Sequence, residues 1–593
     1  MIFILCAVLL AVFLLVAVLA AIKSREKSAL CKKYIFGYAD FAIITALVLM
    51  CSAMLFSGLG SRSSPESTTD VAKMPVAFAF YEPTYVEDLM IYPVSNKING
   101  VDKLMLSYTD EAGREHHKVV TDYNVYSWYM LDVSQKISRL VIYAEGNRLE
   151  IGELGFWTEQ GRMTADASLG AVFLRTDNGF ERSGFEIGIF DEQETIPDRA
   201  DYTNGMYFDE IFHSRTAKEY IDGESAYEWT HPPLGKILIS EGIRLFGMNP
   251  FGWRFMSALF GVLTVAAMYL FAKLVTKNTL ISASAGLLLT FDFMHQVQSR
   301  IGTVDVFLVF FVLLMYMFLY IALSREKVGY LSLLFSGISF GLAFSVKWSA
   351  IYAAIGAGIF LAMRILKKGE QMRERIKLFG FCALVFVLIP ICIYVLSYIP
   401  FVSSDGKTGF AAILENQMNI LSHHGESAVG MVHEYSSKWY TWAFNIKPVF
   451  YCSAWTDAQT VGAISTFGNP IVWWLGIVAV LSNAVLAIAK KDKKAVFLLA
   501  GYFSLMLPWM LIARPAFIYH YYPCTVFMIL LTANMFLHIT ERSKKLSYVA
   551  IGLVTVASVC VLVMFLPVIR GIPVNSEYID RFLQWIPTWN LYV

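Results

Sequence analysis

Charged residues are scarce in this sequence. Only 16% of its 593 residues are Asp, Glu, Lys or Arg, whereas 56% are hydrophobic. Soluble domains carry a charged fraction of about a quarter, so this shortage excludes an ordinary soluble protein. The formal net charge is only +1. The chain therefore also lacks the strongly basic field that attracts nucleic acid.

Paired cysteines and a glycine-rich phosphate loop are also missing. Of the eight cysteines, six lie in or beside apolar runs, Cys31 follows the first run, and Cys452 stands alone in a polar segment. We therefore expect cysteines that fill small core spaces, and no disulfide framework. Without a glycine-rich loop the sequence gives no sign of a nucleotide-dependent reaction.

The apolar residues gather in runs of about 20, the length that crosses a bilayer as a helix. The run at 2–22 lacks the basic start and the cleavage site of a secretory signal, so we expect a retained helix. The pattern predicts a polytopic α-helical membrane protein with about 12 transmembrane helices. The further spans are expected at 35–58, 253–275, 279–298, 303–323, 328–346, 348–366, 378–398, 470–489, 495–513, 517–538 and 547–567.

Short loops between these runs set the orientation. Basic or mixed segments stand at 23–33, 324–327, 367–377, 490–494 and 541–545. Positively charged loops stay in the cytoplasm, and a single topology places all five segments there. We therefore expect a multi-pass protein of the cell membrane, with both termini and the long polar segments outside.

Residues 60–200 alternate apolar and polar side chains over short runs. The runs at 103–108, 128–133 and 139–143 are separated by polar turns, a pattern that predicts an outside β-sandwich. Aromatic rings there would suit stacking on a sugar if they were exposed, but core positions are the stronger expectation. The rings in question are Tyr126, Trp128 and Trp157.

The second outside segment, residues 399–468, is poor in charge and rich in aromatic and histidine residues. Aromatic rings with scattered cations suit a membrane interface. His423, His424 and His433 suggest a metal, but their spacing matches no standard ligand motif. We therefore expect juxtamembrane helices here and no metal site.

An acidic pair follows the expected sandwich. Asp209-Glu210 precedes His231-Pro232-Pro233-Leu234-Gly235-Lys236 and an amphipathic stretch at 234–247. Most acidic dipeptides are solvated loop residues. Beside a bilayer, however, adjacent carboxylates are costly unless they are solvated or paired. Their position therefore makes the pair a candidate catalytic site.

Two arginines stand at the outer ends of spans. Arg254 begins one span, and Arg514 occupies an outer turn together with His520. Guanidinium groups can bind a phosphate through two parallel hydrogen bonds. Both arginines are expected on the same side as Asp209, so the residues indicate an acidic base facing a phosphate pocket.

Another outer turn holds Arg300 and Asp305. Ionisable residues at membrane depth are functional candidates by default. For Asp305, structural pairing with Arg300 or Arg254 is as good an interpretation as a catalytic role. Lys347, between two spans, is expected only to extend its amine to the outer face.

Eight segments, in order from about 205 to 525, resemble the protein O-mannosyltransferases. No single segment is specific, but their number and order are. They are Tyr207-Phe208-Asp209-Glu210, His231-Pro232-Pro233-Leu234-Gly235-Lys236, Trp253-Arg254-Phe255-Met256-Ser257-Ala258, Gln298-Ser299-Arg300 with Asp305, Ser345-Val346-Lys347-Trp348, Tyr435-Ser436-Ser437-Lys438-Trp439-Tyr440-Thr441-Trp442, Gly468-Asn469-Pro470 and Tyr519-His520-Tyr521-Tyr522-Pro523.

The resemblance implies a GT-C glycosyltransferase fold, a polyprenyl-phosphate sugar (usually mannose) as donor, and Ser or Thr hydroxyls of exported proteins as acceptors. It implies Asp209 as the general base or an acceptor-binding carboxylate, and Glu210 as its supporting neighbour. Arg254, Arg514 and His520 would contact the donor phosphate. The supporting residues would be His231, Lys236, Arg300, Asp305, His433, Trp439 and Trp442.

The residue chemistry agrees with this assignment. A phosphate leaving group needs charge stabilisation more than protonation, so cations can replace a general acid. A hydroxyl nucleophile needs one carboxylate as base. A single base without a second nucleophilic carboxylate favours direct displacement with inversion. A divalent metal is an option that we do not favour, because an acidic pair with basic partners resembles an ion-paired site more than a ligand cage.

The apolar runs and polar segments divide the chain into five parts, and the chain departs from the family in several places, including the sandwich ahead of the acidic pair and an additional first span. The parts are two spans in 1–59, the sandwich in 60–200, a catalytic outside loop with spans in 201–398, an outside loop with juxtamembrane helices in 399–468, and spans with a short outside tail in 469–593. The chain lacks the β-trefoil insertion of eukaryotic members in 399–468, which indicates a bacterial-type member. Glu434 stands where the family usually has proline after the histidine.

Other functions stay open on the sequence alone. The same donor chemistry could serve a cell-wall polymer or a lipid as acceptor, and the sandwich would also suit a non-enzymatic glycan-binding, sensor or adhesion protein. A transporter is disfavoured, because the polar residues gather at outer turns and not at the membrane midplane. Besides the bilayer, the donor and the acceptor protein, the export machinery is a candidate partner.

Overall fold

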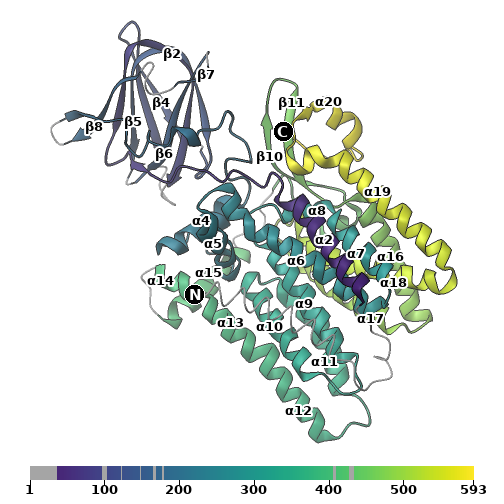
Figure 1. Cartoon of the computed structure of the whole chain (residues 1–593). Helices are drawn as coiled ribbons and strands as arrows, with labels where there is room; N and C mark the ends of the chain where they lie inside the picture. The colour runs from purple at the N-terminus through teal and green to yellow at the C-terminus, as the bar shows by residue number, and fades with distance from the viewer. Residues whose placement is uncertain are drawn as a thin grey trace. The chain divides into compact units, whose positions relative to one another are not determined.

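The computed structural model divides the chain into two compact units (Figure 1). The helical unit comprises Met1–Ser57, Thr216–Gly242 and Arg254–Val593, and the β unit comprises Gly58–Arg215 and Ile243–Trp253. The residues that the structure describes are 37–95, 103–121, 123–146, 148–159, 161–163, 169–176, 179–404, 409–425 and 433–593.

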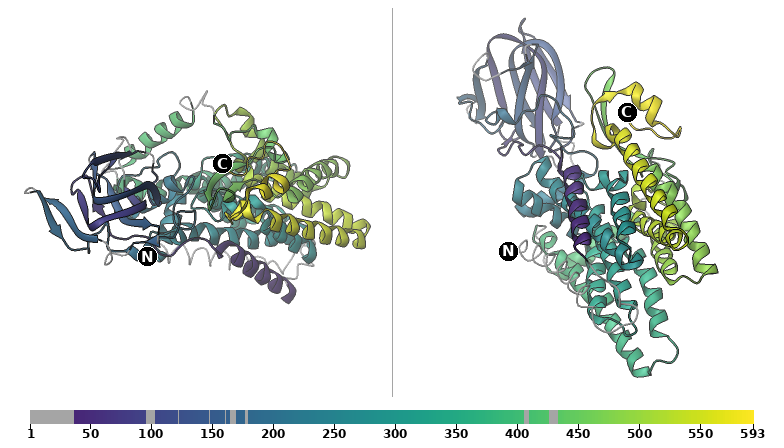
Figure 2. Two further views of the ribbon diagram at one scale, coloured as in Figure 1. Left: turned by 90° about the horizontal axis from the view of Figure 1, so that it is seen from above. Right: turned by 45° about the vertical axis from the view of Figure 1, so that its right-hand side comes forward.

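The helical unit is a bundle of apolar helices (Figure 2). Among the described residues, eight helices are long and apolar enough to cross a membrane, and three shorter apolar helices accompany them. The long ones are α2 (Tyr38–Phe56), α6 (Pro250–Thr276), α9 (Asp305–Leu323), α12 (Met372–Ala383) continued by α13 (Ile389–Ser397), α16 (Pro470–Ala489), α17 (Lys493–Met506), α18 (Tyr522–Arg542) and α19 (Lys544–Arg570); the shorter ones are α7 (Thr279–Thr290), α10 (Tyr330–Val346) and α11 (Ala350–Ile365).

These helices fall on the expected spans, so the prediction of a polytopic helical membrane protein is confirmed. The expected span at 2–22 lies outside the described residues. The expected span at 279–298 is interrupted, because α7 ends at Thr290 and α8 (Phe293–Gln298) begins after Asp292. The Asp292 side chain accepts a hydrogen bond from the His295 N–H at 3.2 Å. This N-cap bond stabilises a new helix start in place of a continuous helix.

The β unit is built around two long, bent strands (Figure 1). β2 and β5 pair antiparallel, with a register shift between Ala79 and Thr84. The first half of β2 lies between β5 and β8, and its second half lies between β5 and β6, so the pair passes from one layer to the other. The strands are β1 (Thr69–Asp70), β2 (Val76–Ser95), β3 (Lys103–Asp110), β4 (Glu115–Val120), β5 (Tyr129–Glu145), β6 (Glu150–Thr158), β7 (Gly161–Arg162), β8 (Leu169–Thr176) and β9 (Gly179–Ser183).

Aromatic side chains fill the space between the two layers. Phe78 from the first half of β2 meets Phe156 of β6 with ring centroids 5.5 Å apart. Trp128 is only 7% exposed and belongs to a second, smaller core cluster, against which Tyr126 and Trp157 pack partly buried. The two-layered β fold and the core position of Trp128 therefore agree with the sequence. The runs at 128–133 and 139–143, expected as separate strands, are parts of β5.

A small sheet in the helical unit joins the second polar segment to the C-terminal tail. β10 (Val449–Trp455) and β11 (Thr460–Thr466) form a hairpin, and β12 (Val574–Asn575) pairs with β11. Trp589 Nε1 donates a hydrogen bond to the Asn445 carbonyl at 2.7 Å. The sequence predicted only a short outside tail here, because pairing across more than 100 residues leaves no local pattern.

A buried ion pair connects α2 to α6. Asp40 accepts hydrogen bonds from Lys273 Nζ and Tyr269 Oη, both at 2.5 Å. Lys273 Nζ also donates to Thr279 Oγ1 at 2.6 Å, and both charged side chains are less than a tenth exposed. In an apolar bundle such charges are tolerated only as a pair with satisfied hydrogen bonds.

Removing one member of this pair should destabilise the protein more than removing both. We expect Asp40→Leu alone to cost about 3–5 kcal/mol, because it leaves the Lys273 ammonium buried without a counter-ion. Asp40→Leu with Lys273→Met should recover most of that loss. Thermal unfolding of the full chain in detergent measures the difference. An Asp40→Leu variant as stable as wild type would contradict the pairing, and the exposed Asp222→Asn serves as the control.

Candidate active site

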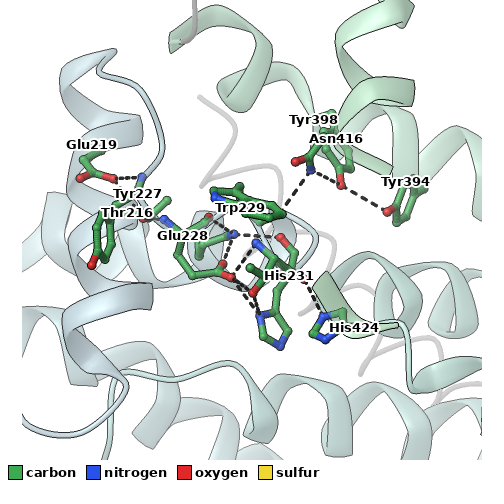
Figure 3. A network of polar contacts seen from close by, with 12 residues as sticks. Thr216, Glu219, Tyr227, Glu228, Trp229, His231, Tyr394, Tyr398, Asn416 and His424 are labelled. Carbon is green, nitrogen blue, oxygen red and sulfur yellow. Dashed lines mark hydrogen bonds and ion pairs between the residues drawn. The ribbon is translucent and has the colours of Figure 1, made fainter. Parts of the chain in front are cut away.

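The segment from Glu228 to Lys236 is organised around one buried carboxylate (Figure 3). Lys236 Nζ donates to the Glu228 carboxylate at 2.5 Å and to the Glu228 carbonyl at 2.7 Å. His231 Nδ1 lies 3.0 Å from the other carboxylate oxygen. Lys236 has no exposed side-chain surface, and Glu228 is 6% exposed. Sequence reasoning selected His231 and Lys236 but missed Glu228, whose only signal was its position three residues before the histidine.

Two prolines and a glycine set the start of α5 (Leu234–Phe246). Proline lacks an N–H and is tolerated in the first turn of a helix, and the Pro233 carbonyl accepts from the Ile237 N–H at 3.0 Å. Lys236 therefore lies in the first turn of α5, where its amine also reaches the His231 carbonyl at 2.9 Å. A Cβ at Gly235 would come within 2.5 Å of Val304, so only glycine permits this packing.

Further bonds tie the loop before Glu228 to the helix α4 (Glu210–Asp222). Glu219 accepts from Thr216 Oγ1 at 3.0 Å and from the Tyr227 N–H at 2.7 Å. Thr216 Oγ1 in turn accepts from the Glu228 N–H at 2.8 Å. Figure 3 shows this chain of contacts leading from Glu219 to Glu228. The carboxylate of Glu228 is thus held from its backbone as well as from its side chain.

The helix α15 (Phe410–His424) contacts the same loop. His424 Nε2 donates to the Thr230 carbonyl at 3.0 Å, and its ring centroid lies 5.7 Å from that of His231. Burial lowers the pKa of His424 to about 4, together with the charge that His231 would carry if protonated and the charge of Arg514. Burial also lowers the pKa of His231, although Glu228 opposes that shift. Both imidazoles are therefore neutral at pH 7.

A second ion pair joins α9 to the end of α10. Lys347 Nζ lies 2.9 Å from Asp305 Oδ1, both side chains are about nine-tenths buried, and Lys347 Nζ stands 5.8 Å from the Tyr519 ring centroid. The expected pairing of Asp305 with Arg300 or Arg254 is therefore wrong. The expectation that Lys347 merely extends to the surface is also wrong, because a buried ammonium needs a counter-ion.

Arg300 supports α2 instead. Its guanidinium donates to the carbonyls of Met54, Leu55 and Ser57 at 3.2, 2.7 and 2.8 Å. These carbonyls belong to the last turn of α2, where the helix leaves acceptors without internal partners. The guanidinium therefore positions α2 and is not aimed at Asp305.

His520 lies in an aromatic cluster at the start of α18. Its ring is nearly parallel to the buried Trp442 ring, with centroids 6.0 Å apart, and it meets the Trp509 ring at 4.3 Å. Trp442 Nε1 donates to Ser437 Oγ at 3.0 Å. The predicted residues His520 and Trp442 are thus brought together. Trp509 was missed, because a tryptophan inside an apolar run resembles any lipid-facing or core residue.

Two other predicted supporting residues lie at the edge of that cluster or outside it. The exposed His433 meets the ring of Phe517 edge-on at 4.9 Å. Trp439 contacts the ring of Tyr440 at 5.8 Å. In the described part of the chain neither side chain contacts the His520 ring, so the predicted tryptophan that packs against this histidine is Trp442 and not Trp439.

Arg514 is a half-buried cation without a polar partner. No hydrogen bond or ion pair joins its guanidinium to another residue in the described part of the chain. Burial is the largest cause that lowers the pKa of His424 and of His231. The charge of Arg514 lowers the pKa of His424 further, and the charge of Lys347 lowers the pKa of His231 further. Side chains from four separate segments (His231, Lys347, His424 and Arg514) thus interact electrostatically. Nowhere in the described ranges do three His, Cys, Asp or Glu side chains gather to hold a metal.

The acidic pair Asp209-Glu210 belongs to the β unit, where the backbone turns sharply into α4. Phe208 has φ of 51°, a left-handed conformation that is rare for a bulky residue. The Asp209 carbonyl accepts from the N–H groups of Phe212 and His213, both at 3.1 Å. Asp209 therefore occupies the N-cap position, where the helix dipole favours a negative charge.

The remaining members of the predicted site also have defined local places. Glu210 Oε2 accepts from the Tyr207 N–H at 3.3 Å, so the second carboxylate braces the turn before it. Arg254 lies in the second turn of α6 and is fully buried. A guanidinium without exposed surface is stable only when its donors are satisfied.

Two family models match the chain. A model described as dolichyl-phosphate-mannose-protein mannosyltransferase matches residues 230–394, and one described as the C-terminal four-transmembrane region of protein O-mannosyltransferase matches residues 409–589. Together they cover more than half of the sequence, including the His231, Lys347, Arg514 and His520 segments. The acidic pair at 209–210 precedes both matched regions.

Curated relatives and a solved structure are also similar. The polyprenol-phosphate-mannose–protein mannosyltransferase of Mycobacterium tuberculosis is 26% identical over 429 residues, covering 60% of this chain and 80% of the relative. The protein of the same name from Corynebacterium glutamicum is 27% identical over 434 residues, with 60% and 81% covered. The Saccharomyces cerevisiae protein O-mannosyltransferase complex bound to its sugar donor superposes with a TM-score of 0.57 at 16% identity, covering 65% of this chain and 90% of that one.

His424 makes stability depend on pH. An unfolded histidine has a pKa near 6.5, whereas that of folded His424 is about 4. Below pH 6.5 the unfolded state therefore takes up the proton first, and stability falls by up to about 1.4 kcal/mol per pH unit until pH 4. We expect the melting temperature of His424→Gln to fall less than that of wild type between pH 7 and pH 5. Equal slopes would contradict this, and the exposed His433→Gln is the control.

Proposed function

Because this chain belongs to the protein O-mannosyltransferase family, we propose that it transfers mannose from a polyprenyl-phosphate carrier to Ser and Thr hydroxyls of polypeptides. The observation that carries the proposal is Arg514. Its guanidinium is half-buried and has no hydrogen-bond or ion-pair partner in the described part of the chain, and its charge acts on a group of side chains that includes neutral histidines and Lys347. A lipid-linked phosphate is the ligand that such a group of side chains suits. The protein is an enzyme of the membrane-bound GT-C class.

We assign the donor phosphate to Arg514 and His520. We leave Arg254 out of this assignment, because its side chain has no exposed surface. A guanidinium offers two parallel N–H groups to a phosphate and keeps its charge at any physiological pH. His520, stacked on Trp442, is positioned to hydrogen-bond an anion rather than to move. Lys347 is already neutralised by Asp305, so it contributes the field of an ion pair and not a free positive charge.

We assign the base to Asp209. The acceptor oxygen attacks the anomeric carbon of the sugar, and the bond from that carbon to the phosphate oxygen breaks. The hydroxyl proton passes to the Asp209 carboxylate, and the polyprenyl phosphate leaves as an anion stabilised by cations. The N-cap position supports an ionised Asp209, and Glu210 braces the turn that carries it. A single displacement inverts the anomeric configuration.

We also propose the orientation in the membrane. The basic loops at 324–327, 367–377, 490–494 and 541–545 support a cytoplasmic side opposite to the site. A first span at 2–22 would bring the number of spans to twelve, with both termini outside. In this orientation the active site and the β unit are on the side that receives the exported polypeptide, and we propose the export machinery as a partner.

The base is tested by Asp209→Asn, which keeps shape and removes the proton acceptor. We expect transfer to a Ser/Thr-rich peptide to fall by about 10²–10⁴-fold in kcat, the usual contribution of a general base. The assay uses purified full-length protein, polyprenyl-phosphate-mannose and product detection by mass spectrometry. Asp222→Asn, at the exposed other end of α4, is the matched control. Equal turnover by Asp209→Asn and wild type would remove Asp209 from this role.

Arg514→Ala should act on the donor. Hydrogen bonds to a charged group contribute about 1.5–3 kcal/mol, so we expect the KM for polyprenyl-phosphate-mannose to rise about 10–100-fold. The KM for the peptide should change little. Arg581→Ala, which removes an exposed arginine near the C-terminus, is the control. An unchanged donor KM in Arg514→Ala would assign the phosphate to other residues.

A further inference from the structure

A cavity of about 200 Å³ lies in the helical unit beside the Glu228 network. The loop before His231 provides one wall with Trp229, and α14 (Ile399–Ser404) provides Phe401. The third wall is one face of α15, where lining positions recur at intervals of three and four residues. These α15 positions are Ala412, Glu415, Asn416 and Asn419.

The carboxamide of Asn416 has an open acceptor toward this cavity. The residue is 4% exposed. Its Nδ2 donates to the Tyr398 hydroxyl at 3.2 Å and to the Trp229 carbonyl at 3.4 Å, which fixes the orientation of the amide. Its Oδ1 accepts no hydrogen bond from any described residue. The oxygen is not fully enclosed by protein, so it is accessible and can accept a hydrogen bond from a ligand hydroxyl.

Hydrogen bonds with Tyr398 and Tyr394 restrain the α15 wall of the cavity (Figure 3). The Tyr398 hydroxyl that receives the Asn416 bond lies 3.3 Å from the Tyr394 hydroxyl, and Tyr394 donates to Gln417 Oε1 at 2.6 Å. Trp348 Nε1 donates to the same Tyr394 hydroxyl at 2.9 Å. A site whose polar groups are fixed before binding loses less entropy when its ligand arrives.

The chemistry of the lining selects a neutral, hydroxyl-rich ligand. Trp229 and Phe401 offer apolar surface for the C–H face of a sugar ring, and the two asparagines offer donors and acceptors for its hydroxyls. The lining contains a carboxylate, Glu415, and no cation, so it is unsuited to a phosphate. The volume of about 200 Å³ is enough for one sugar ring.

We propose that this cavity is a subsite for a single hexose already attached to the acceptor polypeptide. The proposal rests on the proposed function, in which a hexose can arrive on the donor or on a glycosylated acceptor. The donor hexose is joined to a phosphate, which this cation-free lining does not suit, so the acceptor is the source that fits. It predicts that a first mannosylation favours further modification of the same polypeptide. Asn416, through the Trp229 carbonyl, links an occupied subsite to the loop that holds His231.

The kinetic test uses full-length protein in lipid nanodiscs and two peptides that differ only by one O-linked mannose. We expect wild type to have a KM for the glycopeptide about fivefold below that for the bare peptide, the effect of one neutral hydrogen bond or more. Asn419→Ala should abolish this preference without changing the KM of the bare peptide. Ser422→Ala, an exposed residue on the next turn of α15 outside the lining, should keep it.

Equal KM values for both peptides in wild type, or a preference retained by Asn419→Ala, would overturn the proposal. If neither peptide is mannosylated, the proposed function fails, and direct binding then tests the cavity by itself. Saturation-transfer NMR with methyl α-mannopyranoside should give a signal for wild type and Ser422→Ala that is lost in Asn419→Ala. The same signal from all three proteins would reject a sugar subsite here.

Discussion

A fully buried ammonium group governs the arrangement of the helical unit's polar loop. Lys236 lies in the first turn of α5 with no exposed surface, and such a charge is stable only beside a counter-ion and with its hydrogen bonds satisfied. Glu228 supplies the carboxylate, and the carbonyls of Glu228 and His231 supply the remaining acceptors. The loop must therefore fold back over α5. That fold places His231 beside the same carboxylate and presents the Thr230 carbonyl to α15.

The need of a buried charge for a counter-ion also distinguishes cations that are already neutralised within the protein from cations that can bind a ligand. Lys236 is neutralised by Glu228, Lys347 by Asp305 and Lys273 by Asp40. Arg300 is used by the end of α2. Arg514 alone among these has no polar partner in the described residues, which makes it the cation that an anionic donor would neutralise. Glycosyl transfer from a lipid phosphate requires such a charge at the leaving group.

The membrane-spanning helices could be predicted from the sequence because apolar runs of bilayer length are a local feature. The two-layered β fold was readable from alternation, and His231, Lys236, Trp442 and His520 from their motifs. Glu228 and Trp509 could not be predicted, because only their tertiary contacts distinguish them from any other acidic residue and any other tryptophan in an apolar run. The pairing of β12 with β11 and the left-handed Phe208 likewise depend on contacts or backbone angles that no spacing reveals.

The central claim is that the chain moves a mannosyl group from a lipid phosphate to a polypeptide hydroxyl in one displacement. The most direct test is NMR of the purified peptide product made from polyprenyl-phosphate-mannose, together with quantification of the polyprenyl phosphate released. The account predicts one polyprenyl phosphate per mannose transferred, and a glycosidic bond to Ser or Thr of anomeric configuration opposite to that of the donor. Retained configuration, or donor consumed without a modified peptide, would contradict it.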